Sequence, residues 1–225
     1  MAFTGFTKAG ISFFKELAVN NQKEWFEKNR GTYEQHVLDP LKELASGLGP
    51  LLTGIDGHID TTPQVNRAIS RIYRDTRFSK DKSPLRTDAW LSFKRPAKIW
   101  GNGPEFYFYF TTDDYQYGMG YYAASAENME RFRDYMAAFP EKFRPICDRY
   151  REQSLFELVG EDYKRPLPNA LPDEFQRWFQ KKTFCVHYLG KIDDTFFSAQ
   201  LQNDIEKAFA FHADLYRFLT ESSRF

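Results

Sequence analysis

The sequence is poor in the residues that crosslink small proteins or span membranes. It has only two cysteines, Cys147 and Cys185, among 225 residues, and they form no CxxC pair. We therefore expect reduced thiols and a cytoplasmic protein, because disulfides are rare in that compartment. Residues 1–14 lack the apolar core of a secretory signal, and no apolar run approaches the roughly 20 residues of a membrane helix. No membrane partner is expected.

Motifs of common enzyme classes are also missing. The chain has no GxSxG, GxGxxG or GxxxxGK[ST], so the nucleophile-elbow, dinucleotide-binding and P-loop interpretations lose their usual support. The four histidines fall into no HExxH, HxH or Cys/His cluster, and we predict no metal site and no cofactor. They are His36, His58, His187 and His212. The sequence does not decide whether the protein is an enzyme.

Net charge is absent too, with 31 basic and 31 acidic side chains. A general nucleic-acid binder usually carries a basic surplus, so nucleic acid is an unlikely partner for the chain as a whole. Aromatic residues, in contrast, make up 18% of the chain and are spread along its whole length. That spread favours Phe and Tyr as core residues over a set of base-stacking platforms.

Positive charge is concentrated in one place. Residues 67–88 hold seven basic against three acidic side chains, so the segment has a surplus of about four positive charges. Arginines hold phosphate or carboxylate groups through paired hydrogen bonds, and lysines add point charge. Asp75 would orient an arginine or act as a base. The predicted ligand-binding residues are Arg71, Arg74, Asp75, Arg77, Lys80, Lys82 and Arg86, with Asn21 and Trp25 on the wall of the site.

Three interpretations of this run stand side by side. The first is binding, with or without turnover, of a small anionic ligand such as a phosphorylated metabolite or nucleotide. The second is a non-enzymatic interaction module that docks onto an acidic partner or nucleic acid, with an affinity that falls steeply with salt. The third is structural scaffolding, in which acids of the run pair with its arginines and the pairs support the fold.

Periodicity predicts helices at both ends of the chain. Thr7 is a candidate N-cap for a helix over residues 8–18, and Asn21 for the next helix, with Pro40 as a kink or a new start. Gly47, Gly49 and Pro50 are expected to end that pattern. In the second half, helices are predicted over residues 125–139, with Ser125 as cap, 140–150, 172–181 and 199–219.

The middle of the chain indicates β-structure. Strands are predicted at 89–94, 106–110 and 115–123, with a loop at 101–104, and further strands or extended segments at 156–163, 183–189 and 195–198. Residues 106–110 are aromatic at every position, which predicts a strand buried on both faces. The segment before them is ambiguous. A helix from Pro63 with arginines on one side is favoured over a strand, and residues 78–84 are expected to form a loop.

Two smaller patterns bear on a possible site. Gly118 and Gly120 alternate with Met119, so one face of that strand is nearly bare, and close packing explains this better than a ligand does. Cys185 and His187 are two residues apart on a predicted strand and therefore share a side. A Cys–His nucleophile pair is a weak alternative there, because no oxyanion donor can be identified.

Two stretches carry a family resemblance. They are residues 20–26, NNQKEWF, and residues 71–84, RIYRDTRFSKDKSP. Together they resemble a widespread family of bacterial and fungal proteins catalogued as a domain of unknown function, family 2461, and the likeness extends over nearly the whole chain. The family usually has Tyr-Lys-Thr after the proline, where this chain has Leu85-Arg86-Thr87. The resemblance implies a cytosolic α+β protein of about this size and supplies no activity.

The predicted architecture is a single α+β domain over residues 1–225. A mostly antiparallel sheet is covered by helices from both ends of the chain. No linker rich in Gly, Ser or Pro divides the sequence into halves that could fold alone. The oligomeric state is left open.

Overall fold

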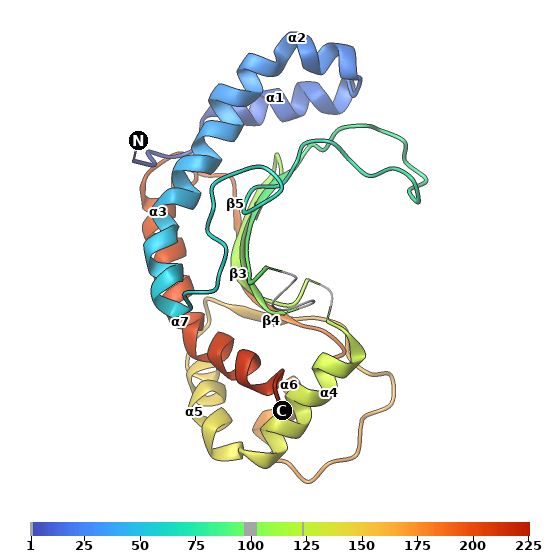
Figure 1. Cartoon of the computed structure of the whole chain (residues 1–225), viewed down its shortest axis with the longest axis vertical. Helices are drawn as coiled ribbons and strands as arrows, with labels where there is room; N and C mark the ends of the chain where they lie inside the picture. The colour runs from blue at the N-terminus through green and yellow to red at the C-terminus, as the bar shows by residue number, and fades with distance from the viewer. Residues whose placement is uncertain (1, 97–102, 123) are drawn as a thin grey trace.

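A computed structural model describes residues 2–96, 103–122 and 124–225 and shows a curved antiparallel sheet with helices on its convex side and at both ends (Figure 1). The strand order is β1-β2-β3-β5-β4, and every neighbouring pair is antiparallel. This confirms the predicted α+β class. The strands are β1 (Ala89–Phe93), β2 (Glu105–Phe110), β3 (Asp114–Gly120), β4 (Glu157–Val159) and β5 (Cys185–Lys191).

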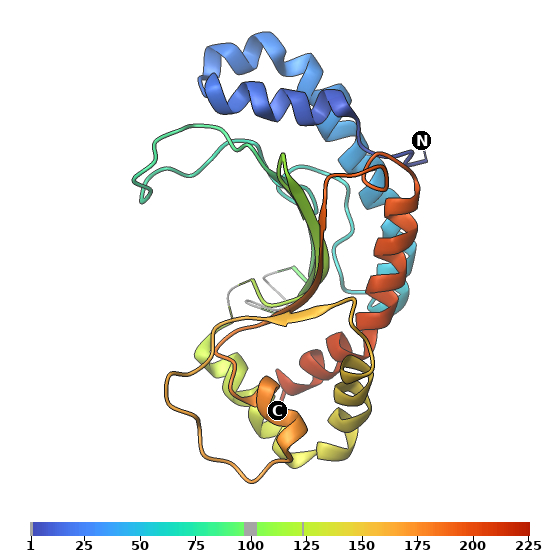
Figure 2. The same cartoon turned by 180° about the vertical axis from the view of Figure 1, so that it is seen from behind.

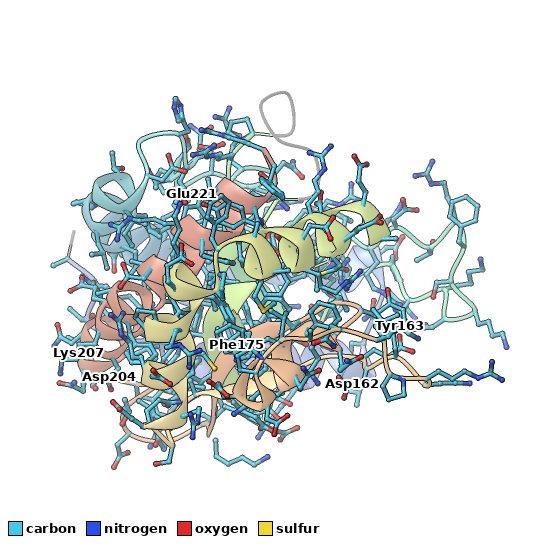
Figure 3. All side chains as sticks on the ribbon, turned by 90° about the horizontal axis from the view of Figure 1, so that it is seen from below. Asp162, Tyr163, Phe175, Asp204, Lys207 and Glu221 are labelled. Atoms are coloured by element: carbon cyan, nitrogen blue, oxygen red, sulfur yellow. The ribbon has the colours of Figure 1, made fainter. Side chains whose placement is uncertain are left out.

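The helices divide into three groups around this sheet. Helices α3 and α7 cover its convex face, α1 and α2 lie at one end, and α4, α5 and α6 lie at the other (Figures 1 and 2). Figure 3 looks onto that second end, with Phe175 of α6 near the centre of the view. The bounds are α1 (Lys8–Val19), α2 (Lys23–Tyr33), a π-helical turn (Glu34–Leu38), α3 (Asp39–Ile55), α4 (Ala126–Ala138), α5 (Pro140–Arg151), α6 (Asp173–Phe179) and α7 (Gln200–Ser222).

Local signals placed several helix starts correctly. The Thr7 hydroxyl accepts a hydrogen bond from the Gly10 amide at 3.1 Å, and the Ser125 hydroxyl accepts one from the Asn128 amide at 3.1 Å. Each hydroxyl satisfies one of the amides that a helix N-terminus leaves without an internal partner. Both predicted caps are confirmed.

Alternation along the strands builds the core. On β2, Phe106, Phe108 and Phe110 point to the convex side and are essentially fully buried. Phe6 stacks on Phe108 and on Phe196, with ring centroids 5.6 and 4.8 Å apart. The aromatic side chains thus fill the space between sheet and helices, which confirms their predicted role as core residues.

The predicted helix from Pro63 to Arg74 is wrong. The segment instead runs alongside β1, where the Ser70 amide donates to the Trp90 carbonyl at 3.0 Å and the Ser92 amide to the Ala68 carbonyl at 2.9 Å. Asn66 adopts a φ of 67°, which a helix does not allow. Hydrogen bonds to a strand distant in sequence outweigh the local three- and four-residue spacing of apolar residues.

Three further predictions differ from the structure. Helix α3 does not stop at Gly47 and continues through Pro50 to Ile55. Gly47 instead allows close packing, because a Cβ there would lie 2.6 Å from the Gln202 side chain of α7. Residues 195–198 form turns and no strand. The predicted strand at 156–163 shortens to β4, and the predicted loop at 101–104 falls partly outside the described residues.

Candidate functional site

A cavity of about 700 Å³ lies on the concave face of the sheet, the face that α3 and α7 leave uncovered. All the strands except β4 contribute to it, together with the segments that flank β1, β2 and β3. Its described lining comprises Arg86, Asp88, Trp90, Ser92, Lys94, Glu105, Tyr107, Tyr109, Gln116, Gly120, Tyr121, Tyr122, Cys185 and His187. We call it the open-face cavity.

Strand alternation explains why this face is polar. Tyr107 and Tyr109 occupy the β2 positions between the buried phenylalanines, so their side chains point to the concave side. Both are only partly buried. The prediction that residues 106–110 are buried on both faces is therefore wrong. One face of β2 is core, and the other lines a cavity.

One end of the cavity pairs a cation with a carboxylate. The Arg86 guanidinium lies 4.7 Å from the centre of the Trp90 ring, and its Nη1 is 3.9 Å from an Asp88 oxygen. Tyr109 donates a hydrogen bond to the other Asp88 oxygen at 3.1 Å. Burial, together with the Asp88 charge, raises the Tyr109 pKa to about 12. Arg86 Nε and Asp88 Oδ1 are both buried without a hydrogen-bond partner.

The other end holds a second charged pair. Lys94 lies 3.1 Å from Glu105, whose carboxylate also accepts a hydrogen bond from Ser92 at 2.5 Å. The Tyr121 hydroxyl is buried here without a partner. Tyr122, in contrast, is largely exposed. Since each end has one cation and one carboxylate, the net charge of these four side chains is zero.

Between the two ends, Tyr107 contacts two residues of β5. Its hydroxyl lies 3.1 Å from His187 Nδ1 and donates to Cys185 Sγ at 3.5 Å. Burial raises the Cys185 pKa and lowers the His187 pKa, while the nearby Glu157 opposes the second shift. Burial also raises the Tyr107 pKa far above its usual range. All three groups are therefore held in their uncharged forms.

Gly118 makes this contact possible. The sheet register places it directly between Tyr107 on β2 and His187 on β5. A Cβ at Gly118 would lie 2.0 Å from the Val186 carbonyl oxygen and 2.8 Å from the His187 Cα. The bare face predicted for β3 is confirmed, and the close neighbour that explains Gly118 is strand β5.

The basic run forms an arm at the rim of the cavity. Residues 71–86, which we call the basic arm, project beyond the sheet on its concave side (Figures 1 and 2). The Arg86 amide donates to the Ile72 carbonyl and the Arg74 amide to the Pro84 carbonyl, each at 2.8 Å. The chain thus turns back on itself like a hairpin. The prediction of a loop over 78–84 agrees with this.

Several cations of the arm already have partners within it. Arg74 pairs with Asp81, and Arg77 pairs with Asp75 at 2.7 Å, which holds the Asp75 pKa at about 2. Lys82 donates to the Thr76 carbonyl at 2.9 Å. Of the predicted site residues, Arg86 is the one that reaches the described cavity lining.

Arg71 and Lys80 form no ion pair within 4 Å in the described part of the chain, although Arg71 acts on Asp75 at longer range, and both are exposed. The Arg77 side chain is also mostly exposed, at 77%. Phe78 beside it is 95% exposed. The surplus positive charge predicted for the run therefore lies at the surface of the arm.

Asn21 lies at the base of the arm, whereas the described ring contact of Trp25 is within the N-terminal helices. The Asn21 side chain donates to the Leu85 carbonyl at 2.9 Å and accepts from the Leu85 amide at 3.0 Å. It does not cap α2, where Gln22 occupies the N-cap position, so that prediction is wrong. Trp25 packs on Phe13 with ring centroids 5.7 Å apart. Neither belongs to the described lining of the cavity.

Sequence reasoning missed most of the cavity. Trp90, Tyr107, Tyr109 and Lys94 were not among the predicted site residues, although hydroxyl-bearing rings alternate with phenylalanines along β2. That alternation was the available signal. Cys185 and His187 share a side as predicted. Tyr107 contacts both, and they form no hydrogen bond to each other among the described contacts.

The described residues hold neither a metal cluster nor a membrane span. In residues 2–96, 103–122 and 124–225, no three His, Cys, Asp or Glu side chains gather where they could hold a metal ion. Over the same residues, none of the helices combines the length and apolar character needed to cross a bilayer.

Comparison with known proteins identifies the family. No curated protein matches the chain. A model of a conserved hypothetical protein family, DUF2461, matches residues 9–218, which include the basic arm and the described lining of the open-face cavity. The match covers nearly the whole sequence, and the chain therefore belongs to the DUF2461 family of conserved hypothetical proteins.

Proposed function

We propose that the protein binds a small, ring-bearing anionic ligand in the open-face cavity, with Arg86 as the anion contact from the basic arm. The observation that carries the proposal is the Arg86 Nε–H, which is buried in the cavity wall without a partner. An unpaired buried donor on a charged group costs free energy that a ligand oxygen would recover.

The size and lining of the cavity support a small-molecule ligand. A volume of about 700 Å³ is typical of pockets that enclose metabolites. Trp90, Tyr107 and Tyr109 provide flat apolar surface for a ring, and their polar atoms would orient it. Asp88 Oδ1 also lacks a hydrogen-bond partner, although it lies 3.9 Å from Arg86 Nη1, so a ligand that carries a donor beside its anionic group fits this end.

The rest of the basic arm would act at longer range. Arg71, Arg77, Lys80 and Lys82 are exposed, and the arm that carries them projects on the concave side of the sheet (Figure 2). Charges arranged in this way raise the local concentration of anions and speed their association without direct contact. Asp75 would hold Arg77, and Arg74 would hold Asp81, so these pairs fix the shape of the arm.

Comparison of two arginine variants tests this assignment. Thermal shift and Trp fluorescence are measured against ring-bearing phosphates, carboxylates, sulfonates and nucleotides, for wild type, Arg86→Ala and Arg77→Ala. A ligand of the cavity should bind Arg86→Ala about ten- to a hundredfold more weakly, since a hydrogen bond to a charged group contributes about 1.5–3 kcal/mol. Arg77→Ala should bind within a few-fold of wild type. Equal stabilisation of wild type and Arg86→Ala by a ligand would place the site elsewhere.

A second candidate function has its own observation, the exposed Phe78 ring at the tip of a basic arm. A cation-flanked ring suits docking onto an acidic partner or a nucleic acid. Binding through the arm should weaken in Phe78→Ala and fall steeply with salt, while Arg86→Ala leaves it nearly unchanged. Affinity that stays flat from low to high salt would count against this candidate.

A further inference from the structure

We infer that His187 takes up one proton when the open-face cavity binds an anion, and then becomes a third cationic contact beside Arg86 and Lys94. The inference rests on the proposed function and adds to it. It makes ligand affinity depend on pH and assigns that dependence to one residue that sequence analysis did not place in the site.

Charge balance is the first argument. Within the described lining, Arg86 and Lys94 are matched by Asp88 and Glu105, at 3.9 and 3.1 Å. An anion therefore adds a negative charge that the charged side chains of the described lining do not compensate. A partly buried charge without a partner is costly. Protonation of a neutral group in the same lining removes this cost, and His187 is the histidine that lines the cavity.

Geometry prepares His187 for that proton. Tyr107 donates its hydroxyl proton to Cys185 Sγ at 3.5 Å, so its oxygen can accept from His187 Nδ1–H at 3.1 Å. This arrangement fixes the ring and leaves Nε2 as the nitrogen that takes up a proton. Gly118 allows it, because a side chain at that position would fill the space across which Tyr107 and His187 meet.

The groups around His187 determine its protonation state before an anion binds. Tyr107 faces it from β2, Cys185 lies two residues away on β5, and Glu157 is its register partner on β4. Gly118 of β3 contributes no side chain. Burial lowers the His187 pKa and Glu157 opposes that shift, so the ring is neutral near pH 7 before an anion binds. Arg86, Asp88, Lys94 and Glu105 complete the charged groups of the lining.

The proton step balances simply. The neutral imidazole accepts a proton from solvent at Nε2 and becomes an imidazolium, while Nδ1–H stays donated to Tyr107. The anion enters with its own charge unchanged. Binding of a monoanion and uptake of one proton together leave the net charge of the cavity as it was.

Benzenesulfonate is a suitable probe, because it is ring-bearing and its charge does not change near neutral pH. Calorimetric titrations at several pH values, in buffers of different ionisation enthalpy, give both its affinity and the number of protons taken up. In wild type the affinity should rise about tenfold for each unit that the pH falls between the His187 pKa of the complex and the lower His187 pKa of the free protein, with uptake of one proton in that range. His187→Gln should bind with a nearly pH-independent affinity.

Two further variants separate a binding role from a structural one. His58→Gln changes an exposed histidine that is not among the described lining residues and should keep the wild-type slope. Tyr107→Phe removes the acceptor for Nδ1–H and should weaken the probe at low pH and reduce proton uptake, while circular dichroism confirms its fold. If His187→Gln does not fold, Tyr107→Phe tests whether the position of the His187 ring controls proton uptake.

The outcomes distinguish this inference from the proposed function. Binding of benzenesulfonate with no pH dependence in wild type, or with the slope retained in His187→Gln, overturns the inference and leaves the anion site standing. A complete lack of binding by this probe at every pH overturns the inference, and a lack of binding across the whole anion panel overturns the proposed function as well.

Discussion

Among single residues, the buried His212 links stability to pH in the acidic range. It is completely buried on α7, where its Nδ1 lies 2.6 Å from the Tyr150 hydroxyl and its Nε2 has no partner. Burial lowers its pKa from 6.5 to about 3. A charged imidazole is therefore disfavoured in the folded state and free to form in the unfolded chain.

The sign of the resulting pH dependence follows from this shift. Because the folded pKa is the lower one, the unfolded chain binds more protons below pH 6.5, and the stabilisation is lost as the pH falls from 6.5 toward 3. We expect His212 to contribute a slope of up to about 1.4 kcal/mol per pH unit in the free energy of unfolding. Urea unfolding at a series of pH values measures it.

His212→Asn is the matched test, because an amide oxygen can still accept from Tyr150 but does not titrate. The variant should be less stable overall and should lose the His212 part of the slope. His58→Gln, which changes an exposed histidine, should keep the wild-type slope. A wild-type slope in His212→Asn would show that another group titrates in this range.

Glycines illustrate how the same residue type acts differently in two elements. Gly118 on β3 has the Val186 carbonyl oxygen where a Cβ would stand, whereas Gly31 in α2 has no neighbour within 4 Å of that position. Gly118→Ala should lower stability by about 1–3 kcal/mol, because neither strand can easily shift. Gly31→Ala should raise it by about 0.5–1 kcal/mol, since alanine favours a helix. Chemical denaturation measures both.

The two variants also differ in what happens to the cavity. Gly118→Ala should separate Tyr107 from His187, which an NMR titration of the His187 ring would detect as a changed pKa. Gly31→Ala should leave that titration unchanged. An equal effect of the two substitutions on stability would contradict the packing seen between β3 and β5.

At the level of elements, the sequence predicted what local chemistry determines. Thr7 and Ser125 cap helices because their hydroxyls bond amides three residues away, and β2 is a strand because its aromatic residues run unbroken between turns. The helix predicted for the segment before β1 was wrong, because Ile69 and Ser70 pair with residues about 20 positions later in the chain. Periodicity alone could not reveal that partner.

For the site, too, local features could be predicted from the sequence and contacts between distant residues could not. Arg86 was predicted because charge is visible in sequence, and it does line the cavity. The contact between Tyr107 and His187 was missed because the two residues are 80 apart in the chain and meet only through the sheet register. Asn21 was assigned a capping role, which is local, whereas its partner Leu85 lies 64 residues away.

For the molecule as a whole, the basic arm is joined to the rest mainly at its base. Asn21 makes both of its hydrogen bonds to the Leu85 backbone, and Tyr73 contacts α2 through Glu27 at 3.2 Å and the edge of Phe26. The contacts described for residues 75–83 are within the arm. We therefore expect the arm to open as a unit once its base is loosened.

Asn21→Ala tests this attachment, with Asn20→Ala as its control. Loss of two partly buried hydrogen bonds should weaken the base locally by about 1–3 kcal/mol and leave the Leu85 amide and carbonyl without partners. Trypsin cleavage at the exposed Arg71, Lys80 and Lys82 should then become about ten- to a hundredfold faster, because proteolysis follows the population of the open form. The described hydrogen bond of the Asn20 side chain goes to the Glu16 carbonyl of α1 and not to the arm, so its variant should be cleaved at nearly the wild-type rate. Equal cleavage of both variants would mean that other contacts hold the arm in place. Asn21→Ala should also weaken anion binding in the cavity, because Arg86 directly follows Leu85, which Asn21 holds.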